Sequence, residues 1–209
     1  MDLDVSQFVR STTLLVVLLN PFLMSIYLLD LIKSLDQGVF SSVLVRGSVL
    51  ATLVFWGFAV GGDAVFSQVF QVRFASFLIF GGVLFVLIAL KFAQSGPDSL
   101  SQLRGKPEHI AGSIAMPFMV GPATVSASVI TGATLPLVWA LAAIGSAMLL
   151  TVLGLLALKR LHGWVQARNE TLVERYIDIV GRASALLIGS IAVDMIINGF
   201  ELWWNARTL

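Results

Sequence analysis

The chain has 209 residues, of which 57% are hydrophobic and only 12% are charged, and its formal net charge is +1. Soluble domains carry about twice this charged fraction, so the composition indicates an integral membrane protein. The near-zero net charge gives no sign of nucleic-acid binding. With no cysteine and two histidines, disulfides, thiolate metal sites and a cysteine nucleophile are excluded, and we expect no metal and no cofactor.

Six apolar stretches follow one another along the chain. Each is near the length of about twenty residues that crosses a bilayer as a helix. They predict an all-α integral membrane fold with six transmembrane helices. The predicted spans are 11–31, 43–62, 74–92, 111–133, 136–158 and 183–204.

The two halves of the chain resemble each other. Residues 75–92 align without a gap with residues 183–200, and an Asn-Pro-Phe in the first half matches a Met-Pro-Phe in the second. The identical pairs are Ala75/Ala183, Ser76/Ser184, Leu78/Leu186, Gly81/Gly189, Ile88/Ile196 and Phe92/Phe200. We therefore expect one membrane domain made of two three-helix repeats, 1–95 and 111–209, joined by a cytoplasmic linker, 96–110. Because each repeat has an odd number of spans, the second is inverted relative to the first.

Lysine and arginine are distributed unequally between the two sides of the membrane that these spans define. One side holds Arg10, Arg73 and Arg207, and the other holds Lys33, Arg46, Lys91, Arg104, Lys106, Lys159, Arg160, Arg168, Arg175 and Arg182. Loops rich in these residues stay in the cytoplasm. The asymmetry predicts a multi-pass protein of the cell (inner or plasma) membrane with both termini outside the cytoplasm.

The stretch 160–182, before the last span, mixes charged residues with apolar ones such as Trp164 and Tyr176. Two interpretations remain open. The stretch is either an amphipathic helix lying on the inner membrane surface or an ordinary basic loop.

Asp194 lies near the middle of the sixth predicted span, where an ionised carboxylate costs about 2.5–3.5 kcal/mol on insertion scales. Ser190, Asp194 and Asn198 are spaced by four residues and therefore share one helical face. We expect this face to point into the bundle, with Asp194 as the proton-coupling group. The alternative is a neutral or paired carboxyl that only ties helices together.

Prolines interrupt the first and fourth predicted spans. Proline removes a backbone donor and clashes with the preceding turn, and within a membrane the freed groups must either find another partner or line a cavity. Breaks at matching places in two repeats are typical of a transporter site, whereas a single break is more often a simple kink. We expect helices 1 and 4 to be broken at proline. The predicted substrate-binding residues are Asn20, Pro21, Ser25, Pro117, Gly121, Pro122, Thr124 and Asn198.

Signatures of catalysis are missing from the sequence. There is no Ser/His/Asp order, no phosphate-cradling glycine loop and no HExxH motif, and His109 and His162 lie in predicted loops without a second ligand at metal spacing. We therefore do not expect an enzyme. Gly81-Gly82 and Gly189-Ser190 indicate close helix crossings rather than ligand contacts.

These motifs resemble the MarC/SnatA family of six-span membrane proteins, within the LysE-like superfamily. The likeness covers nearly the whole chain. It rests on the proline-broken first helix, on Met-Pro-x-x-x-Gly-Pro at 116–122, on Arg46 and Gly81-Gly82, and on the spacing of Arg182, Asp194, Asn198 and Gly199. The chain departs from the family at Leu23, Ile26 and Leu28, which replace Gly, Pro and Phe of the first motif, at Ala185, which replaces a glycine, and at Asp194, which replaces a glutamine.

The resemblance implies a secondary transporter of small neutral amino acids such as alanine and glycine, coupled to an ion gradient. Its partners are then a small-molecule substrate and the lipid bilayer, and a homo-oligomer is compatible with the sequence. Two alternatives stay open. One is a LysE-type exporter of another small metabolite, and the other is a non-transporting membrane scaffold whose polar stripe binds a partner helix.

Overall fold

The computed structural model describes residues 5–28, 31–32, 35–95, 119–166 and 170–206, and the regular elements in these ranges are all helical. They are α1 (Val5–Leu19), α2 (Pro21–Tyr27), α4 (Gln37–Ala64), a π-helical turn (Val65–Val69), α5 (Phe74–Ser95), α7 (Pro122–Thr134), α8 (Leu137–Gln166) and α9 (Glu170–Asn205). The predicted linker 96–110 lies outside the described residues.

Four of these helices are long and apolar enough to cross a membrane. The spans are Gln37–Gly62, Phe74–Lys91, Leu137–Gly163 and Ala185–Asn205. They coincide with the second, third, fifth and sixth predicted spans, and Val5–Leu19 is a shorter apolar helix. The all-helical membrane fold is thus confirmed, whereas the count of six spans stays a prediction.

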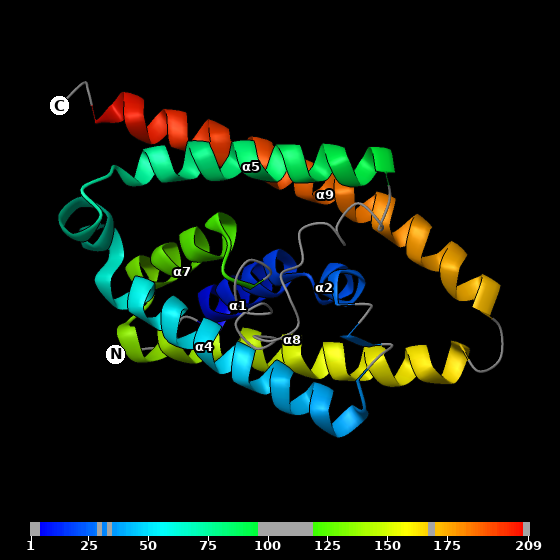
Figure 1. Ribbon diagram of the computed structural model, residues 1–209. Coiled ribbons are helices and arrows are strands. Elements are labelled where there is room, and N and C mark those ends of the chain that lie inside the picture. The colour runs from blue at the N-terminus through cyan, green and yellow to red at the C-terminus, as the bar shows by residue number, and fades with distance from the viewer. Residues whose placement is uncertain (1–4, 29–30, 33–34, 96–118, 167–169, 207–209) are drawn as a thin grey trace.

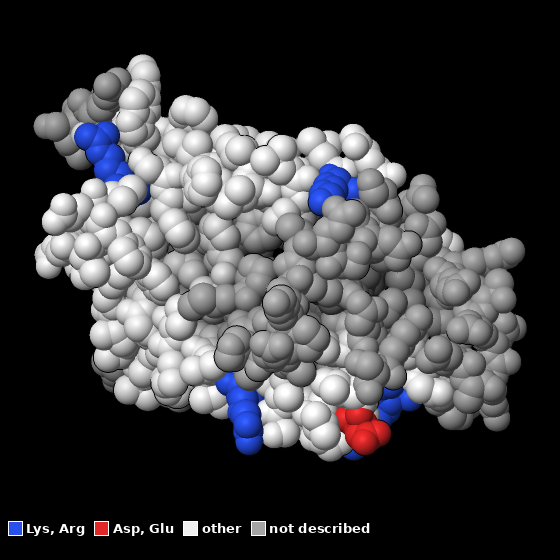
Figure 2. Space-filling view, viewed as in Figure 1, with Lys and Arg blue, Asp and Glu red and all other residues white. Residues whose placement is uncertain are grey.

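The exterior of the bundle is apolar. Large apolar side chains are exposed along the four long helices, including Leu53, Leu87, Leu153 and Leu186. Few Lys, Arg, Asp or Glu side chains interrupt the described surface on the face drawn in Figure 2. A surface of this kind favours lipid over water as its surroundings.

The first predicted span is divided at Asn20. Its backbone N–H still bonds the Val16 carbonyl, at 2.9 Å, but its φ of 42° is left-handed and ends α1. Asparagine tolerates this conformation better than most residues, so it serves as a C-cap. The Asn20 carbonyl then accepts the first hydrogen bond of α2 from Met24 N, at 3.0 Å. Pro21, which has no N–H to lose, occupies the first position of α2.

The long helices run roughly along one direction and alternate in sense (Figure 1). In that view α1, α5 and α8 run from left to right, and α4, α7 and α9 run from right to left. α1 contacts α8, α7 contacts α4, and α5 lies along α9. If α1, α4 and α5 of the first half are matched with α7, α8 and α9 of the second, the α1–α8 contact corresponds to the α4–α7 contact. The α5–α9 contact then corresponds to itself.

Glycines allow α5 and α9 to approach closely. A Cβ added at Gly82 would lie 2.7 Å from the Ala192 carbonyl oxygen, and one at Gly199 would lie 2.9 Å from the Ala75 carbonyl oxygen. Gly81 faces Pro122 of α7 in the same way. These contacts bear out the prediction that Gly81-Gly82 marks a close helix crossing.

The stretch 160–182 forms no separate surface helix. Residues 160–166 continue α8, and residues 170–182 are the first part of α9, which runs without interruption to Asn205. The loop interpretation is therefore wrong for these described residues, whereas the helix of the other interpretation is present as parts of α8 and α9, and its place on the membrane surface stays a prediction. The charged residues of this stretch predicted that it lies outside the apolar spans. They did not indicate that α8 and α9 extend into it.

Candidate functional site

The centre of the bundle is α7. Seven consecutive residues, Ala123 to Val129, are buried, and the helix contacts α1, α4, α5, α8 and α9. Most of these residues are Ala, Ser or Thr, whose small side chains let neighbouring backbones come close. The helix begins at Pro122, after Gly121 in an extended conformation with φ of −117° and ψ of 168°. Within the predicted fourth span, the described chain is thus extended at Gly121 and α-helical from Pro122, while residues 111–118 lie outside the described residues.

Thr124 satisfies the backbone at this break. Its hydroxyl oxygen accepts the N–H of Gly121 at 3.0 Å and lies 2.8 Å from the carbonyl of Met119 and 2.9 Å from that of Gly121. One proton serves one of these carbonyls at a time. The side chain is buried. The structure therefore gives the hydroxyl a capping role, and one lone pair remains for another partner.

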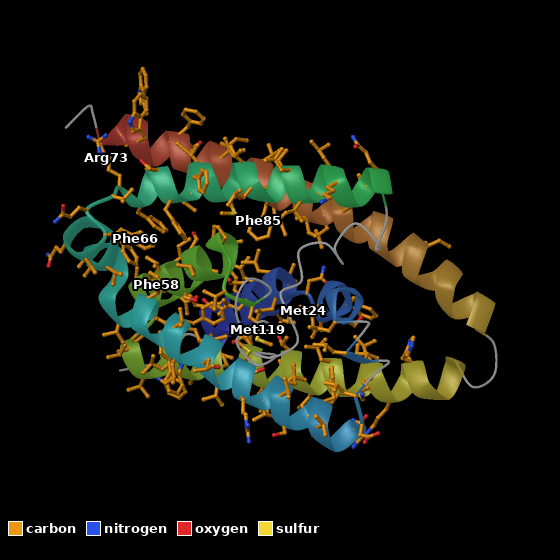
Figure 3. The ribbon with its side chains drawn as sticks, viewed as in Figure 1. Met24, Phe58, Phe66, Arg73, Phe85 and Met119 are labelled. Atoms are coloured by element: carbon orange, nitrogen blue, oxygen red, sulfur yellow. The ribbon has the colours of Figure 1, made fainter. Side chains whose placement is uncertain are left out.

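An aromatic ring covers the break from α5. A Cβ added at Gly121 would lie 3.1 Å from Cζ of Phe85, so the ring lies directly against this glycine. Figure 3 shows Phe85 directed from α5 toward the middle of the bundle. The sequence had not singled out Phe85 because an aromatic residue in an apolar span carries no signal of its own.

The first break lies against α8. A Cβ added at Gly154 would be 3.4 Å from Cβ of Pro21, so this glycine makes room for the proline. Ser25 stays within its own helix, where its hydroxyl donates to the carbonyl of Phe22 at 2.6 Å. Asn20 is half-buried.

The two breaks border the same buried core. Leu19 and Met24 flank the first break, Met119 and Val125 flank the second, and all four belong to a single buried cluster. Met24 and Met119 both lie in the middle of the bundle (Figure 3). Ser48 of α4 reaches the same place, with its hydroxyl 3.8 Å from Sδ of Met119. Both breaks therefore border the same buried core, with Pro21 packed against α8 and Gly121, Pro122 and Thr124 at the start of α7.

Asp194 and Asn198 are not part of this group. Both side chains are exposed on α9, and Nδ2 of Asn198 donates to Oδ2 of Asp194 at 2.9 Å. The buried face of α9 carries Ala192 and Met195 instead. The expectation that Asp194 faces the helix breaks is therefore wrong. The four-residue spacing predicted a shared face correctly, but a sequence does not say which face of an apolar helix meets its neighbours.

Pro117, the remaining predicted site residue, lies outside the described residues. Among the residues that the structure does describe, no three His, Asp or Glu side chains gather in a way that could hold a metal ion.

Lys159 is a buried cation that sequence reasoning counted only as a cytoplasmic charge. Its ammonium donates to the carbonyls of Ile32 and Leu35, at 3.1 and 2.6 Å, and lies 4.5 Å from the centre of the Phe40 ring. It ties the end of α8 to the segment between α2 and α4. The signal available in the sequence was its place at the very end of an apolar span, where long basic side chains turn toward polar groups.

Comparison with known proteins gives one match. A family model described as MarC family integral membrane protein matches residues 5–204, which is nearly the whole chain. No match was found among curated proteins or among solved structures. With its apolar exterior, its four described helices that are long and apolar enough to cross a membrane, and its match over residues 5–204, the chain belongs to the MarC family of integral membrane proteins.

Proposed function

We propose that this protein is a secondary transporter of small neutral amino acids such as alanine and glycine. The observation that carries the proposal is that the backbone leaves helical geometry directly before a proline at Asn20 and at Gly121, and that both places adjoin one buried cluster at the centre of the bundle. Interrupted helices near the bilayer midplane are how many transporters present backbone groups to a solute. Membership of the MarC family is compatible with this role.

The chemistry around the breaks favours a small, uncharged or zwitterionic solute. The side chains that meet there, Met24, Ser48, Phe85, Met119 and Thr124, are all uncharged. They offer apolar contact and a few hydroxyl and backbone groups, which suit an amino acid with a short side chain. The first turn of α7 offers backbone N–H groups to the carboxylate of such a solute.

We further propose the inverted repeat that alternating access requires. It is supported by the opposite sense of α1 and α7, of α4 and α8, and of α5 and α9 in Figure 1. It is also supported by the contacts, because α1 packs against α8 just as its counterpart α7 packs against α4, the counterpart of α8. Asp194 is given no part in coupling, because its side chain is exposed on the far side of α9.

The test is uptake of alanine and glycine into proteoliposomes, with and without an imposed pH or sodium gradient. We expect the uptake rate to depend on an imposed gradient, and we expect it to fall when the chain is modified at Gly121. Gly121→Cys provides the link to the site, since the backbone at Gly121 is extended, the Phe85 ring needs to shift by only a few tenths of an ångström to admit the new Cβ, and the chain has no other cysteine. Its modification by a small thiol reagent should be slowed by alanine and should block uptake. Leu87→Cys, exposed on α5, is the matched control and should show neither effect.

If folded protein carries neither substrate under any gradient, the transport proposal is refuted. If uptake occurs but alanine leaves the modification rate at Gly121→Cys unchanged, transport stands and the site is misplaced.

We also propose that the chain lies in the cell (inner or plasma) membrane with both termini outside the cytoplasm. The first turns of α1, Arg73 and the last turns of α9 lie toward the same end of the bundle in Figures 1 and 3. Fusion to a reporter enzyme that is active only outside the cytoplasm should give activity at the C-terminus and none at Arg160. The reverse pattern would contradict this orientation.

A further inference from the structure

The outward face of α9 carries an unusual pattern for a helix surrounded by lipid. Five exposed residues recur at alternating steps of three and four along it. They are Leu187, Ser190, Asp194, Ile197 and Glu201, which we call the outer stripe. The buried residues Ala192, Met195 and Gly199 occupy the opposite side of the helix, which packs against α5.

Asp194 of this stripe, with its hydrogen-bond partner Asn198, lies too deep for water or lipid headgroups to serve its polar groups. Asp194 is near the middle of the span Ala185–Asn205, so about ten residues, or roughly 15 Å of helix, separate it from either end. The Asn198–Asp194 hydrogen bond uses one amide hydrogen and one carboxyl oxygen. A second amide hydrogen, the amide oxygen and the other carboxyl oxygen remain, and hydrocarbon offers them no partner.

We propose that a second copy of this chain covers the outer stripe, giving a two-fold symmetric dimer in which the two α9 helices run parallel. Two copies inserted with the same topology are related by an axis along the membrane normal, so each residue of the stripe meets its own counterpart. A spacing of three and four residues is the one that keeps two parallel helices in contact along their length. The interface forms whether or not the chain transports a solute.

Hydrogen-bonding complementarity argues for a second copy as the occupant. A two-fold interface requires a surface that complements itself. The Asp194–Asn198 unit holds both donors and acceptors, so each copy can supply the groups that the other lacks. Polar residues at positions that face a partner helix also fix the register and the number of helices that associate. Interhelical hydrogen bonds of this kind stabilise association in membranes.

The natural lack of cysteine makes the test direct, because each single-cysteine variant reports only on its own position. Ser190→Cys and Ile197→Cys lie on the outer stripe. Val193→Cys and Phe200→Cys are matched controls, being exposed on the same helix but to one side of the stripe. In liposomes of high lipid content, treated with an oxidant, the first two should form disulfide-linked dimers at least tenfold faster than the controls. Equal rates on and off the stripe would overturn the proposal.

A second measurement keeps the inference testable if cysteine perturbs the interface. The dimer fraction of labelled protein in liposomes is counted by single-molecule photobleaching at falling protein density. Asp194→Leu removes the polar pair and should weaken dimerisation roughly tenfold, whereas Asp194→Asn keeps hydrogen-bonding groups and should retain it. Leucine suits a lipid-facing position, so this variant is expected to fold. Wild-type protein that stays monomeric at every density would refute the dimer.

Discussion

Replacing Gly132 with alanine tests the close packing of α7 against α4. A Cβ added at Gly132 would lie 2.7 Å from the carbonyl carbon of Ala59 and 2.8 Å from its Cα, and closer still to its carbonyl oxygen. Carbon atoms that are not bonded prefer separations of about 3.5–4.0 Å. Because all the atoms in the way are backbone, no side chain can rotate aside, and the two helices must separate by about 1 Å.

The expected cost follows from two opposing effects. Overpacking of this kind destabilises by about 1–3 kcal/mol. Alanine also favours the helix over glycine by up to about 1 kcal/mol. Since the overlap involves only backbone, we expect the overpacking to fall at the upper end and the net loss to be about 1–2 kcal/mol. For a chain of this size that lowers the apparent Tm by about 2–8 °C.

Gly57→Ala is the control, because it lies on α4 and a Cβ there would meet nothing within 4 Å. It should leave the Tm unchanged or raise it slightly, through helix propensity alone. Thermal unfolding in detergent, followed by the fluorescence of the five tryptophans, measures both variants under one scan rate. If Gly132→Ala were as stable as the wild type, or if Gly57→Ala lost as much, the packing argument would be wrong.

Three further pairs of substitutions test other contacts by the same assay. Asn20→Val should be less stable than Asn20→Gly by about 1–2 kcal/mol, because only glycine accepts the left-handed φ without strain; equal Tm values for the two variants would contradict this. Lys159→Met should lose about 1.5–3 kcal/mol by leaving two carbonyls without their cation, while Arg160→Met, exposed and adjacent, should change the Tm little. Thr124→Val should cost about 1–3 kcal/mol, and Thr124→Ser, which keeps the hydroxyl, should recover most of it; a serine variant as unstable as valine would rule out the capping role.

Much of the membrane fold could be predicted from local sequence. Four spans were located to within a few residues, apart from the upstream extension of α9, because twenty apolar residues have only one stable arrangement in hydrocarbon. The breaks at Asn20-Pro21 and Gly121-Pro122 were equally local, since proline and left-handed asparagine act on their own backbone wherever they occur. The close helix crossing at Gly81-Gly82 was also predicted from local sequence, because two adjacent residues without side chains favour close approach of a neighbouring helix.

The site could be predicted only in part. Both breaks border one buried core, but a shared substrate site stays a prediction, and Phe85, Ser48 and Met119, which lie around the second break, are ordinary members of apolar helices. Nothing in their local sequence distinguishes them from residues that face lipid. Their place at the breaks depends on how α4 and α5 pack around α7.

Asp194 is the clearest example of a feature that local sequence could predict only in part. Its position in the chain determines that a carboxyl lies deep in the membrane and shares a helical face with Ser190 and Asn198. Which way that face points was decided by tertiary packing, because Ala192 and Gly199 allow α9 to approach α5 on its other side. Periodicity fixes angles around one helix axis, and only the neighbouring helices fix the rotation about that axis.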